Sequence, residues 1–198
     1  MIESLTVGEK IPEIKAKAYF PKTDSIEEVM LPSKEKKWTI LTFYPGDFTF
    51  VCATDIEELM KRYEDFKKNN AEIYTISTDS IYSHKAWVET SPRVKLSAIP
   101  MLEDFKKEIT KSMGFLNDST GAARRGVVIV DPEGVVQYLA VFNDALGKDV
   151  DHIYNAFLGL KYLYEHKAAA GHACIIPANW KPGKPAMEVD LVKDIGKL

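Results

Sequence analysis

The residue of this chain best suited to covalent chemistry is Cys52, one of only two cysteines. Residues 43–58 read FYPGDFTFVCATDIEE, a pattern that predicts a strand end, a turn through Pro45-Gly46-Asp47 and then an amphipathic helix. The free amides and the dipole at a helix N-terminus favour a thiolate over a thiol, and the thiolate is the nucleophile. The alternative interpretation is a buried, inert cysteine, which is common for free cysteines.

Two neighbours of Cys52 have side chains that fit such a site. Thr49 precedes Cys52 by three residues, so the two should lie on one face of a helical turn. The Thr49 hydroxyl can accept a hydrogen bond from a substrate while directing one at the thiolate. A plain N-cap role is the alternative. Pro45 would shield the thiolate from bulk water.

Length and composition exclude several classes of protein. The chain has 198 residues, a net charge of −3 and no basic patch, so we expect no nucleic-acid partner. No apolar run reaches the roughly 18 residues of a membrane span, and the first residues do not resemble a secretory signal. Two cysteines are too few for a secreted disulfide scaffold. We therefore expect a cytoplasmic protein with no membrane partner, in which a disulfide would be catalytic or sensory.

The sequence contains no motif for a dithiol reductase, a metal site, a phosphate or a dinucleotide. There is no Cys-x-x-Cys, which argues against a thioredoxin-type reductase. The four histidines lack metal-binding spacing, and neither a phosphate loop nor a Gly-x-Gly-x-x-Gly fingerprint is found. We therefore expect no metal and no cofactor.

The elements that must position Cys52 alternate between strand and helix, after short edge strands and loops before residue 36. Strands are predicted over 39–44, 72–77, 126–130 and 135–142, with a short apolar segment at 98–102. Helices are predicted from the Cys52 region to Asn69-Asn70 and over 80–89, 105–113 and 150–164. This order indicates an α/β layer sandwich with a mixed sheet, compatible with a thioredoxin-like architecture. Residues 1–165 should form this domain, and residues 166–198 a proline-rich C-terminal arm with a linker-like run at 168–171.

Pro45, Thr49 and Cys52, spaced as Pro-x-x-x-Thr-x-x-Cys, resemble the peroxidatic motif of the peroxiredoxins. The resemblance extends over nearly the whole chain. Its other parts are the segment His84-Lys85-Ala86-Trp87, Arg125 before an apolar strand, Cys174 with Pro177 and Trp180-Lys181, and the tail Leu191 to Lys197. The tail is similar to the end of the peroxidase component of alkyl hydroperoxide reductases, so the chain resembles a typical two-cysteine peroxiredoxin of that branch.

The resemblance implies a thioredoxin-like fold and reduction of hydrogen peroxide and organic hydroperoxides by a thiol. Cys52 would become a sulfenic acid, and Cys174 of the partner subunit would resolve it to a disulfide. Arg125 would hold the thiolate and the peroxide oxygens with fixed donors. The adjacent Arg124 should point elsewhere.

The resemblance also assigns supporting roles. Asp55 or Glu58 would orient Arg125, although the helix dipole alone also favours an acid in a first turn. Tyr44 should line the pocket wall, and Trp87 should serve packing.

The sequence departs from the family pattern at a few positions. Ala53 and Asp55 stand where a proline and a glutamate are usual, and Lys148 stands where an arginine is frequent. Ile175-Ile176 are extra residues after the second cysteine. These departures bear on the rate and geometry of the resolving step and remove no catalytic group.

A conformational change is implied as well, because Cys52 must leave its pocket to meet its partner. Thr54 followed three residues later by Glu57 matches a capping box, which can cap a helix whose first turn has unwound. Ala53 would give the longer helix one more amide bond in the reduced state. The insert Gly-Gly-Leu-Gly and the C-terminal Tyr-Phe of easily over-oxidised relatives do not occur, so Cys52 should resist sulfinylation.

The resemblance implies partners too. A flavoprotein disulfide reductase or a thioredoxin-like protein would recycle the disulfide. The subunits would form an obligate homodimer, commonly in a ring of five dimers. Two alternatives come from other classes: a redox-regulated chaperone or scaffold ring, and a cysteine hydrolase that pairs Cys52 with a histidine.

Overall fold

The computed structural model describes residues 5–166, 172–190 and 192–196. The chain divides into two compact units, residues 1–150 and 151–198, and each is described by itself. The predicted division into a peroxidase domain over residues 1–165 and a C-terminal arm over residues 166–198 stays a prediction. In the described part of the chain, no helix is long and apolar enough to cross a membrane.

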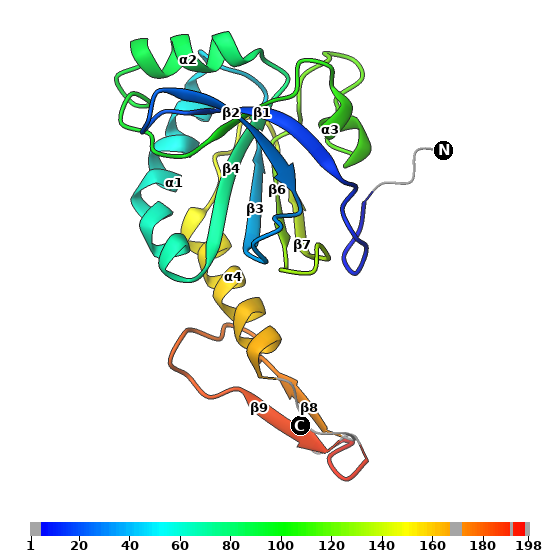
Figure 1. Ribbon diagram of the computed structural model, residues 1–198. Coiled ribbons are helices and arrows are strands. Elements are labelled where there is room, and N and C mark those ends of the chain that lie inside the picture. The colour runs from blue at the N-terminus through cyan, green and yellow to red at the C-terminus, as the bar shows by residue number, and fades with distance from the viewer. Residues whose placement is uncertain (1–4, 167–171, 191, 197–198) are drawn as a thin grey trace. The chain divides into compact units, whose positions relative to one another are not determined.

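The first unit is built on a seven-stranded mixed sheet in the order β2-β1-β5-β4-β3-β6-β7 (Figure 1). The strands are β1 (Ile14–Phe20), β2 (Ser25–Leu31), β3 (Trp38–Phe43), β4 (Ala71–Ser77), β5 (Met101–Glu103), β6 (Gly126–Val130) and β7 (Val136–Val141). The neighbours of β4 run parallel to it, whereas the other pairs are antiparallel. Every residue of β3 and β6 is buried, as expected for strands covered on both faces. The predicted mixed α/β sheet is thus confirmed.

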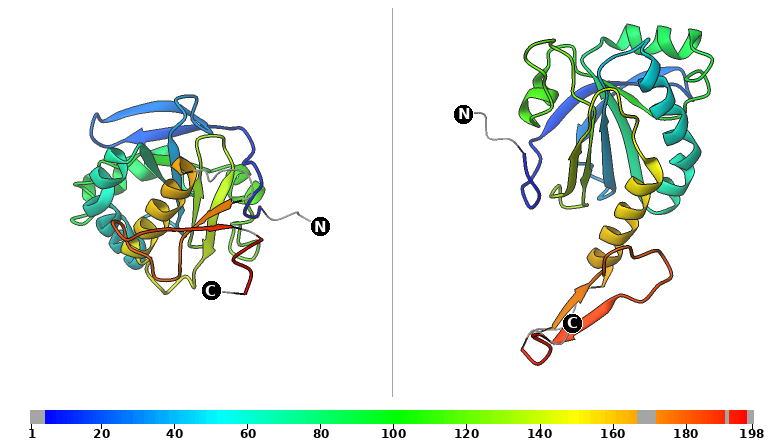
Figure 2. Two further views of the ribbon diagram at one scale, coloured as in Figure 1. Left: turned by 90° about the horizontal axis from the view of Figure 1, so that it is seen from below. Right: turned by 180° about the vertical axis from the view of Figure 1, so that it is seen from behind.

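Three helices belong to this unit: α1 (Phe50–Lys68), α2 (Ile81–Thr90) and α3 (Glu108–Ser112). Helix α1 connects the parallel strands β3 and β4, and it lies on the opposite side of the sheet from α3 (Figures 1 and 2). Its apolar residues Ile56, Leu59 and Phe66 are buried, as their spacing predicts. Asn69 ends α1, and Ser80 caps α2 by accepting from the Ser83 amide.

The predicted helix over 105–113 is wrong in its first turn, because α3 begins only at Glu108. The carboxylate of Asp104 accepts hydrogen bonds from the amides of Ile109 and Thr110, at 3.0 and 2.7 Å. Lys107 then adopts a left-handed conformation with φ of 62°. The turn between them leaves Phe105 66 % exposed.

The second unit contains most of α4 (Val150–Glu165) and an antiparallel hairpin of β8 (His172–Ile175) and β9 (Met187–Asp190). The Trp180 ring packs 5.8 Å from the Tyr162 ring of α4, and its indole N–H donates to the carbonyl of Lys184. The sequence pattern predicts the helix but not the hairpin, because strands that pair across a proline-rich loop leave no local pattern. The linker-like run at 168–171 lies outside the described residues.

Candidate active site

Cys52 is the third residue of α1 and is only 1 % exposed. The loop that leads to it is anchored where β3 ends, because the Tyr44 amide donates to the carbonyl of Ile76 at 3.0 Å. Thr49 occupies the N-cap position, and the amide of Ala53 donates to its carbonyl at 3.4 Å, the bond that a proline at 53 could not make. The thiol therefore sits at a helix N-terminus, as the sequence predicts.

Arg125 is brought to Cys52 by the register of the sheet. Gly126, the next residue, pairs with Phe43 at the end of β3, where the loop to α1 begins. The Arg125 Nη2 donates to Cys52 Sγ at 3.4 Å, and Nε and Nη2 donate to the carbonyl of Asp144 at 3.2 and 2.9 Å. Arg124 is exposed. The sequence-based pairing of Cys52 with Arg125 rather than Arg124 thus agrees with the geometry.

The glycine beside Arg125 is required by packing. A Cβ built on Gly126 would lie 2.0 Å from Phe115, whose ring stacks on that of Phe43 at 4.2 Å. Such an approach cannot be tolerated without moving Phe115 or the strand. Gly126 therefore lets the backbone next to Arg125 approach the core closely.

Asp55 completes a buried charge cluster with Arg125 and Lys148. Its Oδ2 pairs with Arg125 Nη1 and, at 2.9 Å, with Lys148 Nζ. Its Oδ1 accepts from the Lys148 backbone amide at 2.8 Å. The three side chains are at most 2 % exposed. Of the two acids suggested by the sequence, the structure brings Asp55 to Arg125, whereas Glu58 pairs with Lys61 on the exposed face of α1.

The electrostatics of this cluster follow from burial and charge. Burial alone would lower the pKa of Arg125, but the charges of Asp55 and Cys52 raise it above its ordinary value. Burial lowers the pKa of Lys148, and the charge of Asp55 opposes that fall. The guanidinium thus remains charged beside the sulfur of Cys52.

Thr49 is placed as an acceptor rather than as a donor to sulfur. Its hydroxyl donates to the carbonyl of Gly46 at 2.8 Å. A hydroxyl has one hydrogen, so in this arrangement Thr49 cannot also donate to Cys52, while its lone pairs stay available to a substrate. Pro45, just before Gly46, is half-buried.

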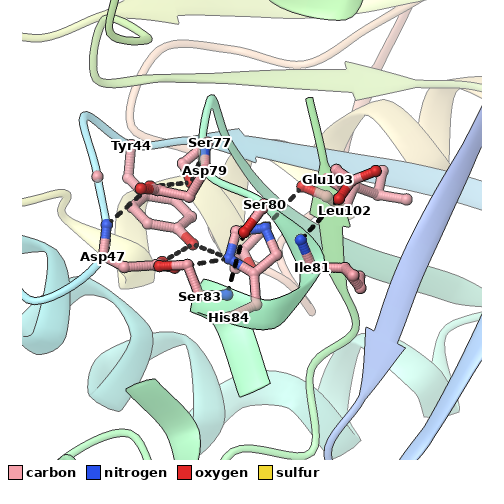
Figure 3. Close-up of polar contacts among 12 residues, drawn as sticks. Tyr44, Asp47, Ser77, Asp79, Ser80, Ile81, Ser83, His84, Leu102 and Glu103 are labelled. Atoms are coloured by element: carbon pink, nitrogen blue, oxygen red, sulfur yellow. Dashed lines mark hydrogen bonds and ion pairs between the residues drawn. The ribbon is translucent and has the colours of Figure 1, made fainter. Parts of the chain in front are cut away.

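Tyr44 packs in the same apolar cluster as Cys52, but its hydroxyl serves a different network (Figure 3). It donates to Asp47 at 2.7 Å, and Asp47 in turn contacts His84 Nδ1 at 2.9 Å. The other ring nitrogen of His84 lies 3.1 Å from the carbonyl of Leu102. Burial, with the charge of Asp47, raises the pKa of Tyr44 well above its ordinary value.

This network ties the active-site loop to the rest of the unit. The Asp47 amide donates to the carboxylate of Asp79, which also accepts from the Ser77 hydroxyl at 2.7 Å. The sequence pattern does not indicate a role for Asp47, and His84 stands out in it only as part of a family segment. The two are 37 residues apart, and no local pattern indicates their contact.

An open hollow of about 410 Å³ borders the start of α1. Its lining includes Thr49 and Ala53 together with three aromatic residues, Phe48, Phe50 and Trp87. Phe50 is 93 % exposed and Phe48 is 58 % exposed, whereas Trp87 is buried. Tyr44 is not among the residues that line this hollow, and its predicted place in the wall of the substrate pocket stays a prediction.

Comparisons with known proteins identify relatives of this chain. The model of the AhpC/TSA family matches residues 7–139. Alkyl hydroperoxide reductase C of Amphibacillus xylanus is 35 % identical, and the alignment covers 97 % of this chain and 98 % of that protein. The chloroplastic 2-Cys peroxiredoxin BAS1 of Arabidopsis thaliana is 37 % identical over 93 % of this chain and 68 % of its own.

Solved structures give the same result. The reduced 2-Cys peroxiredoxin of Plasmodium vivax superposes with a TM-score of 0.83 and 36 % identity, covering 92 % of this chain and 93 % of that one. AhpC of Enterococcus faecalis superposes with a TM-score of 0.78 and 27 % identity, covering 83 % of this chain and 97 % of that one.

The chain therefore belongs to the AhpC/TSA family. Its fold is thioredoxin-like, as predicted, and its enzyme class is that of the peroxiredoxins, peroxidases whose nucleophile is a thiol. The family predicted from the sequence is confirmed.

Proposed function

We propose that the protein reduces hydrogen peroxide and organic hydroperoxides through Cys52. The thiolate attacks one peroxide oxygen, the O–O bond breaks, and the second oxygen takes a proton and leaves as water or an alcohol. Cys52 is oxidised to a sulfenic acid in this step. The observation that carries the proposal is the 3.4 Å contact between Arg125 Nη2 and Cys52 Sγ inside a buried, ion-paired cluster.

Arg125 and Thr49 complete the proposed reaction geometry. The guanidinium is held by Asp55 and by the carbonyl of Asp144, so its donors are fixed before peroxide arrives. Such preorganised donors stabilise charge as it moves to the leaving oxygen. Thr49 would accept from the peroxide hydroxyl and so set the direction of attack.

The second half of the proposed cycle uses Cys174. Its thiol, from a second copy of the chain, attacks the sulfenic sulfur, and water leaves as the disulfide forms. Both thiols are free and Cys174 is half-exposed in β8, which suits a thiol that must travel. A flavoprotein reductase or a thioredoxin-like dithiol then reduces the disulfide by exchange.

Cys52 must become accessible for this step, because a sulfur that is 1 % exposed cannot meet a second thiol. We propose that the first turn of α1 unwinds and that Thr54 becomes the new N-cap. In the folded helix the Thr54 hydroxyl donates to the carbonyl of Val51, and Glu57 pairs with Arg93. Unwinding would free Thr54 to accept from the Glu57 amide in a capping box.

The proposed assembly is a homodimer within a larger ring, expected to be a decamer of cytoplasmic protein. Two exposed aromatic side chains, Phe48 and Phe50, line the hollow, and Tyr82 of α2 is 77 % exposed as well. Exposed apolar groups of this size favour contact with another chain. Sedimentation of wild type and Phe50→Asp tests this, since the substitution should shift a large assembly toward smaller species.

The test of the proposed function is peroxide consumption with non-reducing electrophoresis. Wild type should consume peroxide and form an intersubunit disulfide dimer, whereas Cys52→Ser and Cys174→Ser should form none. Peroxide turnover that survives in Cys52→Ser would contradict the proposal. If the protein were instead a redox-regulated chaperone or scaffold ring, it would keep its chaperone activity without any peroxide turnover. A hydrolase is disfavoured because both ring nitrogens of His84 contact groups other than Cys52.

A further inference from the structure

Lys148 takes no part in the proposed steps, yet its side chain is only 1 % exposed. It lies in the loop between β7 and α4, two residues before α4 begins. Lysine is almost never fully buried unless it is paired, because removing its charge from water is unfavourable. Its position therefore calls for a physical reason.

The loop is shaped to hold Asp55 at two points. Lys148 Nζ lies 2.9 Å from Asp55 Oδ2, and the Lys148 amide donates to Oδ1 at 2.8 Å. A Cβ built on Gly147 would come within 3.4 Å of the same carboxylate, so the backbone passes in close contact. Lys148 thus contacts both carboxylate oxygens of Asp55, whereas Arg125 Nη1 contacts Oδ2.

Lys148 contributes a positive charge that balances the buried cluster. When Cys52 is a thiolate, the buried cluster contains two anions, Cys52 and Asp55, and two cations, Arg125 and Lys148. Without Lys148, one guanidinium would face two buried anions. Like charges that share a buried site repel each other, so the anionic sulfur and the carboxylate of Asp55 would then compete for a single cation.

We propose that Lys148 is a positioning residue that balances the charge of Asp55 and so leaves the guanidinium of Arg125 to stabilise the Cys52 thiolate. The inference rests on the proposed function, in which that thiolate is the nucleophile. It concerns a lysine and an aspartate at positions where the resembling family often has an arginine and usually a glutamate. The shorter acid is met here by a lysine whose backbone and side chain both reach it.

The other titratable groups near Cys52 do not replace Lys148. Asp144 is exposed, and its carboxylate accepts from the Arg125 amide at 3.2 Å. Tyr44, which shares the apolar cluster with Cys52, directs its hydroxyl to Asp47 and His84. Among the described groups, the cations within contact of Asp55 are therefore Arg125 and Lys148.

The experiment measures how fast iodoacetamide alkylates Cys52 as a function of pH, in a Cys174→Ser background. Lys148→Met should shift the midpoint of this curve upward by about one pH unit, which lowers alkylation about tenfold below the midpoint. Adding Asp55→Asn to Lys148→Met should bring the midpoint back toward the starting protein, because the unbalanced anion is gone. Lys61→Met, which removes an exposed lysine paired with Glu58 on the same helix, should cause no shift.

Two results would overturn the inference. One is an unchanged midpoint in Lys148→Met. The other is a double variant at least as impaired as Lys148→Met, which would indicate a merely structural role. Near-ultraviolet circular dichroism checks folding, and Lys148→Gln, which is polar and neutral, carries the same prediction if the methionine variant does not fold. Alkylation requires no peroxide, so this result is independent of whether the proposed peroxidase cycle is correct.

Discussion

The surroundings of Cys52 and Cys174 differ in almost every physical respect. Cys52 is buried at a helix N-terminus, with a guanidinium on its sulfur and an ion-paired cluster behind it. Cys174 is half-exposed in a four-residue strand, directly opposite Glu188 in β9. A two-stranded hairpin is only marginally stable by itself, so it can rearrange at small cost. This difference suits the proposed cycle, in which Cys52 would react with a small substrate and Cys174 of a second copy would then react with Cys52.

The strongest test of the difference between Cys52 and Cys174 replaces the sulfur of Cys52 with oxygen. Cys52→Ser should lower peroxide turnover by at least about a thousandfold, because a serine hydroxyl in this setting is not ionised and lacks a base. A stopped-flow assay of peroxide loss measures it. Comparable turnover supported by Cys174 alone would remove the distinction between the two cysteines.

The next largest effect concerns the guanidinium. Arg125→Met should reduce the rate of the first oxidation by about a hundredfold or more, the range seen when one preorganised donor is lost. Single-turnover oxidation of Cys52, followed by mass spectrometry, gives the rate. Arg124→Met, a change of the same kind at the exposed neighbour, is the matched control and should stay within about twofold of wild type.

Cys174→Ser separates the two halves of the cycle. The first oxidation of Cys52 should keep its wild-type rate, since the site in the first unit is intact. Steady-state turnover with a protein dithiol or flavoprotein reductant should fall by about tenfold or more, because no intersubunit disulfide forms. Slow first oxidation in this variant would mean that Cys174 also helps to build the peroxide site.

A smaller effect is expected at the helix start. Thr54→Val should slow disulfide formation about fivefold, the factor that corresponds to about 1 kcal/mol for a lost N-cap. The rate is measured after sulfenic acid has formed, so the first oxidation serves as the internal control. An unchanged rate would eliminate the capping-box hypothesis.

The smallest effect concerns over-oxidation. At low peroxide during turnover, little sulfinic acid should accumulate on Cys52, because resolution by Cys174 competes well with a second oxidation. Intact-mass measurements count the added oxygen atoms. Heavy sulfinylation under these conditions would show that the start of α1 unwinds slowly.

Sequence patterns predicted those parts of the molecule that depend on local spacing. The apolar face of α1, the turn after Tyr44 and the N-terminal place of Cys52 all follow from residues within one or two turns of each other. The contact of Asp47 with His84 could not be predicted in this way, because a single hydrogen bond joins two segments that are 37 residues apart. The hairpin around Cys174 also escaped prediction, since its strands pair across a proline-rich loop.

The choice between Asp55 and Glu58 shows the same limit. Both acids lie in the early part of α1, and the helix dipole favours either. Only the tertiary position of Arg125, set by the pairing of β6 with β3, selects Asp55. Likewise, nothing in the local pattern around Lys148 indicates that its side chain is buried against that acid.

The most direct measurement of the central claim traps the first oxidation product. Reduced Cys174→Ser protein is given one equivalent of hydrogen peroxide in the presence of dimedone, which reacts with sulfenic acids, and the adduct is mapped by mass spectrometry. A single adduct on Cys52 is the predicted result, and Arg125→Met in the same background should form it far more slowly. Failure to label Cys52, together with a peroxide-dependent adduct on Cys174 in the Cys52→Ser protein, would contradict the account.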